Sequence, residues 1–170
     1  MKAAFLFFFL WLVVFPVFSQ EGEPRALGIG AIYNFQTDGI GAEVRGYFPI
    51  RGRLALSPQF LIFPTNIVHE FYLGLSAQYT LFDIRNWHLY ALGAAYYNDW
   101  YNYANFDSKV AKQNNFDYQV GGGLMRAIGC LKPYIEARYD GKWKEARLHV
   151  GILISFNDCF APRQNCPAYN

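Results

Sequence analysis

The chain has 170 residues, enough for one domain of ordinary size, and its 15 basic and 13 acidic residues give a formal net charge of +2. Hydrophobic residues make up 53%, aromatic residues 19% and charged residues only 16%. This composition excludes a disordered protein, which is poor in aromatic residues and rich in charge, and it lacks the strong positive charge of a nucleic-acid-binding protein.

The first 19 residues form a segment of their own. Lys2 supplies a positive charge, Ala3–Phe15 is an uninterrupted apolar run, and Pro16 ends that run. This order predicts a secretory signal peptide over residues 1–19, cleaved before Gln20. The alternative is an uncleaved membrane anchor, but the run is shorter than the roughly 20 residues that a spanning helix requires.

Residues 20–156 alternate apolar and polar positions between turn-forming residues, which predicts one β-domain. Asp38-Gly39 separates the first two runs and is a typical hairpin signal. Each run is about ten residues long, the length that a tilted strand needs to cross a bilayer. We predict eight strands: Ala26–Phe35, Ile40–Ile50, Leu54–Phe63, Glu70–Phe82, Trp87–Tyr97, Phe116–Ile128, Lys132–Asp140 and Arg147–Phe156.

The connections between these runs alternate in length. The second, fourth and sixth connections (residues 51–53, 83–86 and 129–131) are short, whereas the other set contains the longest loop, residues 98–115. Short periplasmic turns, longer outer loops and an even number of strands are typical of transmembrane barrels. The sequence therefore predicts an all-β, eight-stranded, antiparallel, up-and-down transmembrane β-barrel with both termini in the periplasm.

Alternation along each run separates two faces. In the last run, Leu148, Val150 and Ile152 share one face, and Arg147 and His149 share the other. A soluble, lipocalin-like barrel is the alternative, with its apolar face turned inward. Long apolar faces almost free of charge, polar faces rich in Gly, Ser and Tyr, and aromatic residues at the strand ends favour the membrane barrel.

The final run, which alternates from Leu148 to an aromatic residue at Phe156, resembles the last strand of small outer-membrane β-barrels. The stretches 43–50 and 56–60 are similar to porin-family or OmpA-type barrels of the kind common in Bacteroidota. This resemblance covers residues 26–156 as a pattern. It implies a place in the cell outer membrane, contact with the lipid bilayer, and recognition of the last strand by the barrel assembly machinery. The chain departs from that pattern because 14 residues follow Phe156.

Several charged residues are predicted to face the lumen, and closure of the barrel brings them onto one wall. An eight-stranded lumen is just wide enough for side chains to fill it. We therefore expect an ion-pair network that plugs the barrel, with a proton or ion path and an acid/base site as alternatives. The predicted members are Glu43, Arg45, Glu136, Arg138, Arg147 and His149, with Asp140 as a further candidate.

The sequence offers little support for an enzyme. A lipid-modifying barrel needs a nucleophile beside a base, and no Gly-x-Ser-x-Gly motif is present. His149 and Ser155 share a face but stand six residues apart, which is roughly 20 Å along a strand. We expect no enzymatic activity, no cofactor and no metal.

Two other segments are candidates for recognition. Trp100, Tyr101, Tyr103 and Phe106 lie in the loop 98–115, where exposed aromatic residues suit partner binding. The alternative is that they form an aromatic girdle and a hairpin cap above the membrane.

The tail, residues 157–170, carries Cys159 and Cys166, which we expect to form a disulfide in an oxidising compartment. Three interpretations of this segment stay open: it docks on a partner, it caps the periplasmic mouth of the barrel, or it is a frayed tail. Cys130, in the sixth connection, either competes for a tail cysteine or is a free thiol.

These features predict a small outer-membrane barrel with a plugged lumen, acting as a structural or accessory protein that binds other outer-membrane proteins or joins a larger complex. The alternative is a barrel that binds or transports a small ligand or ion through its lumen.

Overall fold

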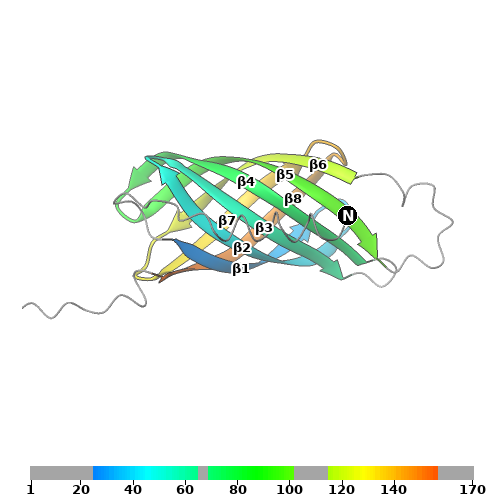
Figure 1. The fold of residues 1–170 in the computed structure, drawn as a ribbon, viewed down its shortest axis with the longest axis horizontal. Coiled ribbons are helices and arrows are strands. Elements are labelled where there is room, and N and C mark those ends of the chain that lie inside the picture. The colour runs from blue at the N-terminus through cyan, green and yellow to red at the C-terminus, as the bar shows by residue number, and fades with distance from the viewer. Residues whose placement is uncertain (1–24, 65–68, 102–114, 157–170) are drawn as a thin grey trace, which may run out of the picture.

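The computed structural model describes residues 25–64, 69–101 and 115–156, and these form one closed antiparallel barrel (Figure 1). The predicted fold class is confirmed. The predicted signal peptide and tail lie outside the described residues. The strands are β1 (Ala26–Asn34), β2 (Gly39–Arg51), β3 (Leu54–Pro64), β4 (His69–Ile84), β5 (Trp87–Tyr101), β6 (Asn115–Arg126), β7 (Leu131–Asp140) and β8 (Glu145–Ser155).

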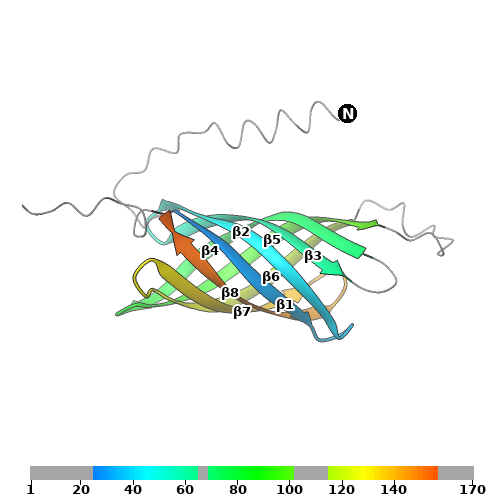
Figure 2. The ribbon, with the colours of Figure 1, turned by 90° about the horizontal axis from the view of Figure 1, so that it is seen from below.

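The barrel closes between its first and last strands. β1 pairs with β8 in an unbroken antiparallel register, from Ala26 opposite Ser155 to Asn34 opposite Arg147. Figure 2 shows β8, in orange, beside β1, in blue. Closure leaves no unpaired strand edge, and no helix in the described part of the chain is long and apolar enough to cross a membrane.

The connections alternate as predicted. Residues 52–53, 85–86 and 127–130 form the short turns at one end, and β5 ends and β6 begins at the other end. Gly129 has a φ of 59°, a left-handed conformation that glycine adopts without steric cost. The chain therefore turns there, and β6 ends at Arg126 rather than at the predicted Ile128.

Strict alternation fails at one point in β4. The register between β4 and β5 shifts between Thr80 and Phe82, and as a result Leu81 and Phe82 are both exposed, at 41% and 60%. A β-bulge adds one residue to a strand, so the faces predicted from simple alternation hold only as far as this bulge.

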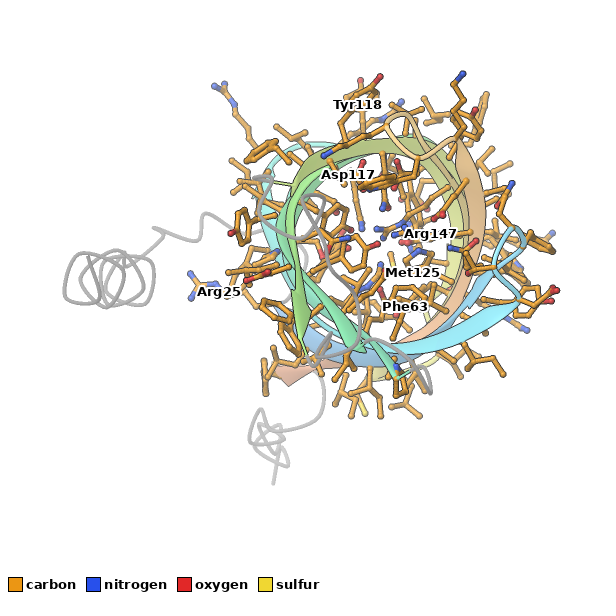
Figure 3. The ribbon with its side chains drawn as sticks, turned by 90° about the vertical axis from the view of Figure 1, so that its right-hand side faces the viewer. Arg25, Phe63, Asp117, Tyr118, Met125 and Arg147 are labelled. Carbon is orange, nitrogen blue, oxygen red and sulfur yellow. The ribbon has the colours of Figure 1, made fainter. Side chains whose placement is uncertain are left out.

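Polar side chains fill the barrel and apolar side chains cover it. In Figure 3, Asp117 and Arg147 point into the lumen, whereas Tyr118 points outward. The charged side chains that face outward from the described strands stand within the last three residues of their strands: Arg51, Asp99 and Arg126. This arrangement is the reverse of a lipocalin-like barrel and is that of a membrane-spanning one.

The lumen also contains two apolar clusters, one towards each end. The cluster near the short turns includes Tyr47, Ala55 and Met125, and the cluster near the longer connections includes Phe63 and Tyr72. A band of charged and polar side chains lies between them.

Candidate functional site in the barrel lumen

Glu136 on β7 is the centre of a buried charge network. Both of its carboxylate oxygens accept hydrogen bonds from Arg45 on β2, at 2.5 and 2.9 Å. Arg138, two residues along β7, donates to the same carboxylate from Nε at 2.9 Å, and Tyr90 on β5 donates at 2.6 Å. A bidentate arginine–carboxylate pair is among the stronger charge-assisted contacts in proteins, and here it ties β2 to β7 across the lumen.

Glu43 on β2 forms the second carboxylate of the network. It pairs with Arg45 at 2.5 Å and accepts a hydrogen bond from Tyr134 on β7. Nδ1 of His149 on β8 lies 3.0 Å from the other oxygen of Glu43. The Arg45 guanidinium also lies 4.1 Å from the centre of the Tyr134 ring, so its charge is held by carboxylates and by an aromatic face.

Arg138 extends the network to the opposite wall. Its Nη1 donates to Gln59 Oε1 on β3 at 2.8 Å and to the Tyr96 hydroxyl on β5 at 2.5 Å. Gln59 in turn donates to Ser76 on β4 at 3.1 Å. Together these contacts join side chains from β2, β3, β4, β5, β7 and β8.

The network needs glycines on the strands behind it. Gly30 on β1 and Gly151 on β8 are direct neighbours. A Cβ atom at Gly30 would lie 2.6 Å from the Tyr134 hydroxyl, and one at Gly151 would also collide with it. The absent side chains therefore make the space in which Tyr134 reaches Glu43.

Arg147 lies in a separate cluster towards the longer connections. Its Nη2 is 3.0 Å from the Tyr72 hydroxyl, 2.9 Å from Glu145 and 3.4 Å from Asp140. Its guanidinium also lies 5.4 Å from the centre of the Phe63 ring. The sequence placed Arg147 on one wall with the other lumen charges, but it contacts this outer group rather than Glu43 or Glu136.

Sequence reasoning missed several lumen residues. Gln59, Asp117 and Gln119 are 2%, 0% and 1% exposed, and Gln119 donates to Asp117 at 3.3 Å. The alternation of β3 and β6 carries the signal for these residues, because each of them alternates with an outward-facing apolar residue. Tyrosines were expected on the polar faces, but their hydrogen bonds to Glu43 and Glu136 were not predicted.

The outer part of the lumen is less fully hydrogen-bonded than the central network. Asn98, Asp117 and Gln119 each have a buried oxygen without a hydrogen-bond partner among the described residues. Within the described ranges, no three His, Cys, Asp or Glu side chains gather as a metal site. His149 has Glu43 as its partner, and Ser155 stands six residues further along the same strand.

The predicted recognition loop is only partly described. Trp100 and Tyr101 belong to the end of β5, because this strand continues four residues past its predicted end at Tyr97. Tyr103 and Phe106 lie outside the described residues.

Cys130 is disulfide-bonded, and its carbonyl oxygen accepts a hydrogen bond from the backbone N–H of Ser155 at 2.8 Å. The other two cysteines of the chain, Cys159 and Cys166, lie outside the described residues. The predicted Cys159–Cys166 disulfide therefore lies outside the described residues and stays a prediction.

The fold is similar to solved membrane barrels. The N-terminal β-barrel domain of Pseudomonas aeruginosa OprF matches with a TM-score of 0.60 and 14% identity, covering 80% of this chain and 100% of that chain. The Yersinia pestis outer membrane protein Ail, in a phospholipid bilayer nanodisc, matches with a TM-score of 0.54 and 10% identity, covering 79% and 100%. A de novo designed transmembrane β-barrel matches with a TM-score of 0.58 and 12% identity, covering 79% and 97%.

No family model matches the sequence, and no curated protein matches it. The likeness to these barrels therefore rests on structure and establishes the fold. It agrees with the resemblance to small outer-membrane barrels drawn from the sequence, although none of these neighbours points to Bacteroidota.

Proposed function

We propose that this chain is a small outer-membrane β-barrel with a plugged lumen, acting as a structural or accessory protein that binds partners in that membrane. The observation that carries the proposal is the central charge network. The side chains of Glu43, Arg45, Glu136 and Arg138 are at most 1% exposed, and their two negative and two positive charges balance.

A balanced, hydrogen-bonded network favours a barrier over a pore. Moving an ion through it would require separating buried ion pairs, and breaking one such pair costs several kcal/mol. The apolar clusters on both sides of the network add to that barrier.

The outer surface supports insertion in a bilayer. Ile29, Val44 and Val120 stand on three different strands and are 63%, 53% and 56% exposed. A band of such residues around a closed barrel is stable in hydrocarbon and unfavourable in water. We propose the outer membrane as its location, with the short turns and both termini in the periplasm.

Partner binding is proposed for two segments. One is the aromatic end of β5 and its loop, with Trp100, Tyr101, Tyr103 and Phe106, on the outer side. The other is the tail, residues 157–170, on the periplasmic side, where the barrel assembly machinery and other outer-membrane proteins are accessible. No enzymatic activity is proposed, because the charged residues of the central network are engaged with one another.

A ligand-binding or ion-transporting barrel is the second candidate. The buried oxygens of Asn98, Asp117 and Gln119 without hydrogen-bond partners among the described residues favour it, since such groups suit a small polar guest. Ion transport requires a path through the lumen past Glu136. Ligand binding alone requires only a site between Glu136 and the longer connections.

Planar-bilayer recording distinguishes the two candidates. We expect the wild-type protein to insert without a stable conductance, and Arg45→Ala with Glu136→Ala to conduct, because that pair spans the lumen. Heat-modifiable migration on gels is the control for folding, and Asp38→Asn in the exposed β1–β2 turn is the control variant. A steady conductance through the wild-type protein would overturn the plugged lumen and favour transport.

A further inference from the structure

A shallow groove lies on the outer, membrane-facing wall of the barrel. Its volume is about 510 Å³, within the range of roughly 300–1,000 Å³ that is usual for small-molecule sites. Its lining is apolar and includes Leu81, Leu89, Ala91, Gly122, Ala137 and Leu148.

Small residues form the floor of this groove. Ala91 on β5 is the direct neighbour of Gly122 on β6, and Gly122 is the direct neighbour of Ala137 on β7. Larger residues such as Leu81 and Leu89 form its sides. A row of small side chains beside leucines leaves a shallow apolar depression, against which a hydrocarbon chain can pack.

The groove runs obliquely from one end of the barrel towards the other. Leu81 stands three residues before the end of β4, at the end with the short turns. Leu148 stands three residues after the start of β8, at the opposite end. The groove therefore crosses the barrel wall from β4 to β8, oblique to the strands.

Arginines stand at the short-turn end of the groove. Arg126 pairs with Trp87 across β6 and β5, and its guanidinium lies 5.1 Å from the centre of the Trp87 ring. The next outward-facing pair along the same strands is Leu89 and Leu124, in the groove lining. Arg53 Nη1 donates to the carbonyl oxygen of Leu81 at 3.3 Å.

Arg126 is exposed and takes part in none of the ion pairs among the described residues. Asp83 is the acidic residue that the described chain places at this end, and it lies 3.6 Å from His88. The exposed basic residues at this end outnumber it and comprise Arg25, Arg51, Arg53, Arg85 and Arg126. Such an excess of arginine attracts anionic lipid headgroups, and guanidinium groups bind phosphate well.

We propose that this groove binds one anionic glycerophospholipid, with a hydrocarbon chain over Gly122 and the headgroup phosphate at Arg126. The inference rests on the proposed function, because it requires the barrel to stand in a bilayer. The proposed site gives the barrel a preference for anionic lipid. This preference applies to one side of the barrel and to the leaflet that contacts the short turns.

Native mass spectrometry of the exported protein, taken from vesicles of equal phosphatidylglycerol and phosphatidylcholine, tests the site. We expect the protein to retain phosphatidylglycerol in preference to phosphatidylcholine. Arg126→Gln should lower that preference about fivefold, the contribution of one basic residue at an anionic surface. Ala137→Leu should lower the retention of both lipids by filling the groove.

Two matched variants serve as controls. Lys144→Gln removes an exposed basic residue in the β7–β8 turn at the opposite end, and Ala31→Leu enlarges an outward-facing alanine on β1. Equal retention of the two lipids by the wild type, or equal losses in the control variants, would overturn the lipid site alone. Failure to insert in vesicles, seen as a loss of heat-modifiable migration, would overturn the proposed function together with the site.

Discussion

Glu136 joins three lumen residues, since it accepts hydrogen bonds from Arg45, Arg138 and Tyr90. Its side chain has no exposed surface. Water therefore cannot replace these contacts when the carboxylate is removed, and two buried guanidinium groups lose their main counter-charge.

Glu136→Gln should destabilise the barrel by about 3–5 kcal/mol, the usual cost of breaking a buried ion pair. Urea unfolding in detergent, followed by the heat-modifiable band, measures this change. Asp38→Asn serves as the control, because Asp38 lies in an exposed turn. An equal effect of the two substitutions would show that the network adds nothing to stability.

Gly151→Ala should also destabilise the barrel, by about 1–3 kcal/mol, because the new methyl group collides with the Tyr134 hydroxyl. Gly93→Ala is the matched control, since no atom lies within 4 Å of a Cβ at Gly93.

Adding Tyr134→Ala to Gly151→Ala removes both the hydroxyl and the ring carbon that collide with the new methyl group. The double variant should therefore lose less stability than the sum of the two single variants, measured by the same urea unfolding. A strictly additive pair would contradict the proposed contact.

The individual lumen charges were predictable from the sequence because side chains in a strand alternate between two faces. Their partners were not. Alternation gives the face of Arg147 but not its height in the barrel, which depends on the register between β7 and β8. For the same reason the contact between Arg45 and Glu136, 91 residues apart in sequence, could not be assigned from the sequence.

At the scale of the strands, all eight elements were predictable, and the errors lie at their ends. β5 continues to Tyr101 because it pairs with the extended β4 as far as His69. The sequence of one strand does not show how far its neighbour pairs with it, so this extension could not be predicted. The bulge between Thr80 and Phe82 was likewise hidden, since Tyr79, Leu81 and Phe82 fit a regular strand equally well by composition.

Disulfide mapping of the exported protein tests the connection after β6. We expect Cys130 to be joined to Cys159, because the Cys130 carbonyl lies 2.8 Å from the backbone N of Ser155 and Cys159 follows four residues later. Pairing with Cys166 would close a longer loop, at a larger cost in chain entropy. A proteolytic fragment linking Cys159 to Cys166 would contradict this pairing and restore the one expected from the sequence.

At the scale of the whole molecule, the closure of the sheet and the polar lumen inside an apolar outer surface have one physical origin, which is the hydrocarbon of the membrane. Backbone groups in hydrocarbon must all be paired, so a membrane-spanning sheet has to close on itself. With eight strands the lumen is filled by side chains, and here those side chains are charged and paired while the outer surface is apolar. The polar and apolar faces of the strands predicted a polar lumen and an apolar outer surface. The groove above Gly122 could not be predicted, because it depends on the register between β5, β6 and β7.

Contact between the apolar outer surface and lipid hydrocarbon is what distinguishes a membrane-spanning barrel from a soluble one. Val150, outward on β8 and 47% exposed, pairs with Ala31 and Ile135 on the neighbouring strands and is a mid-barrel probe. Lys142, in the β7–β8 turn, is the control position.

The measurement is the collision rate of a spin label at Val150, in liposomes, with oxygen and with a water-soluble nickel complex, using a chain whose cysteines are replaced by serine. We predict frequent collisions with oxygen and few with nickel at Val150, and the reverse at Lys142. Nickel accessibility at Val150 equal to that at Lys142 would contradict a membrane-spanning barrel.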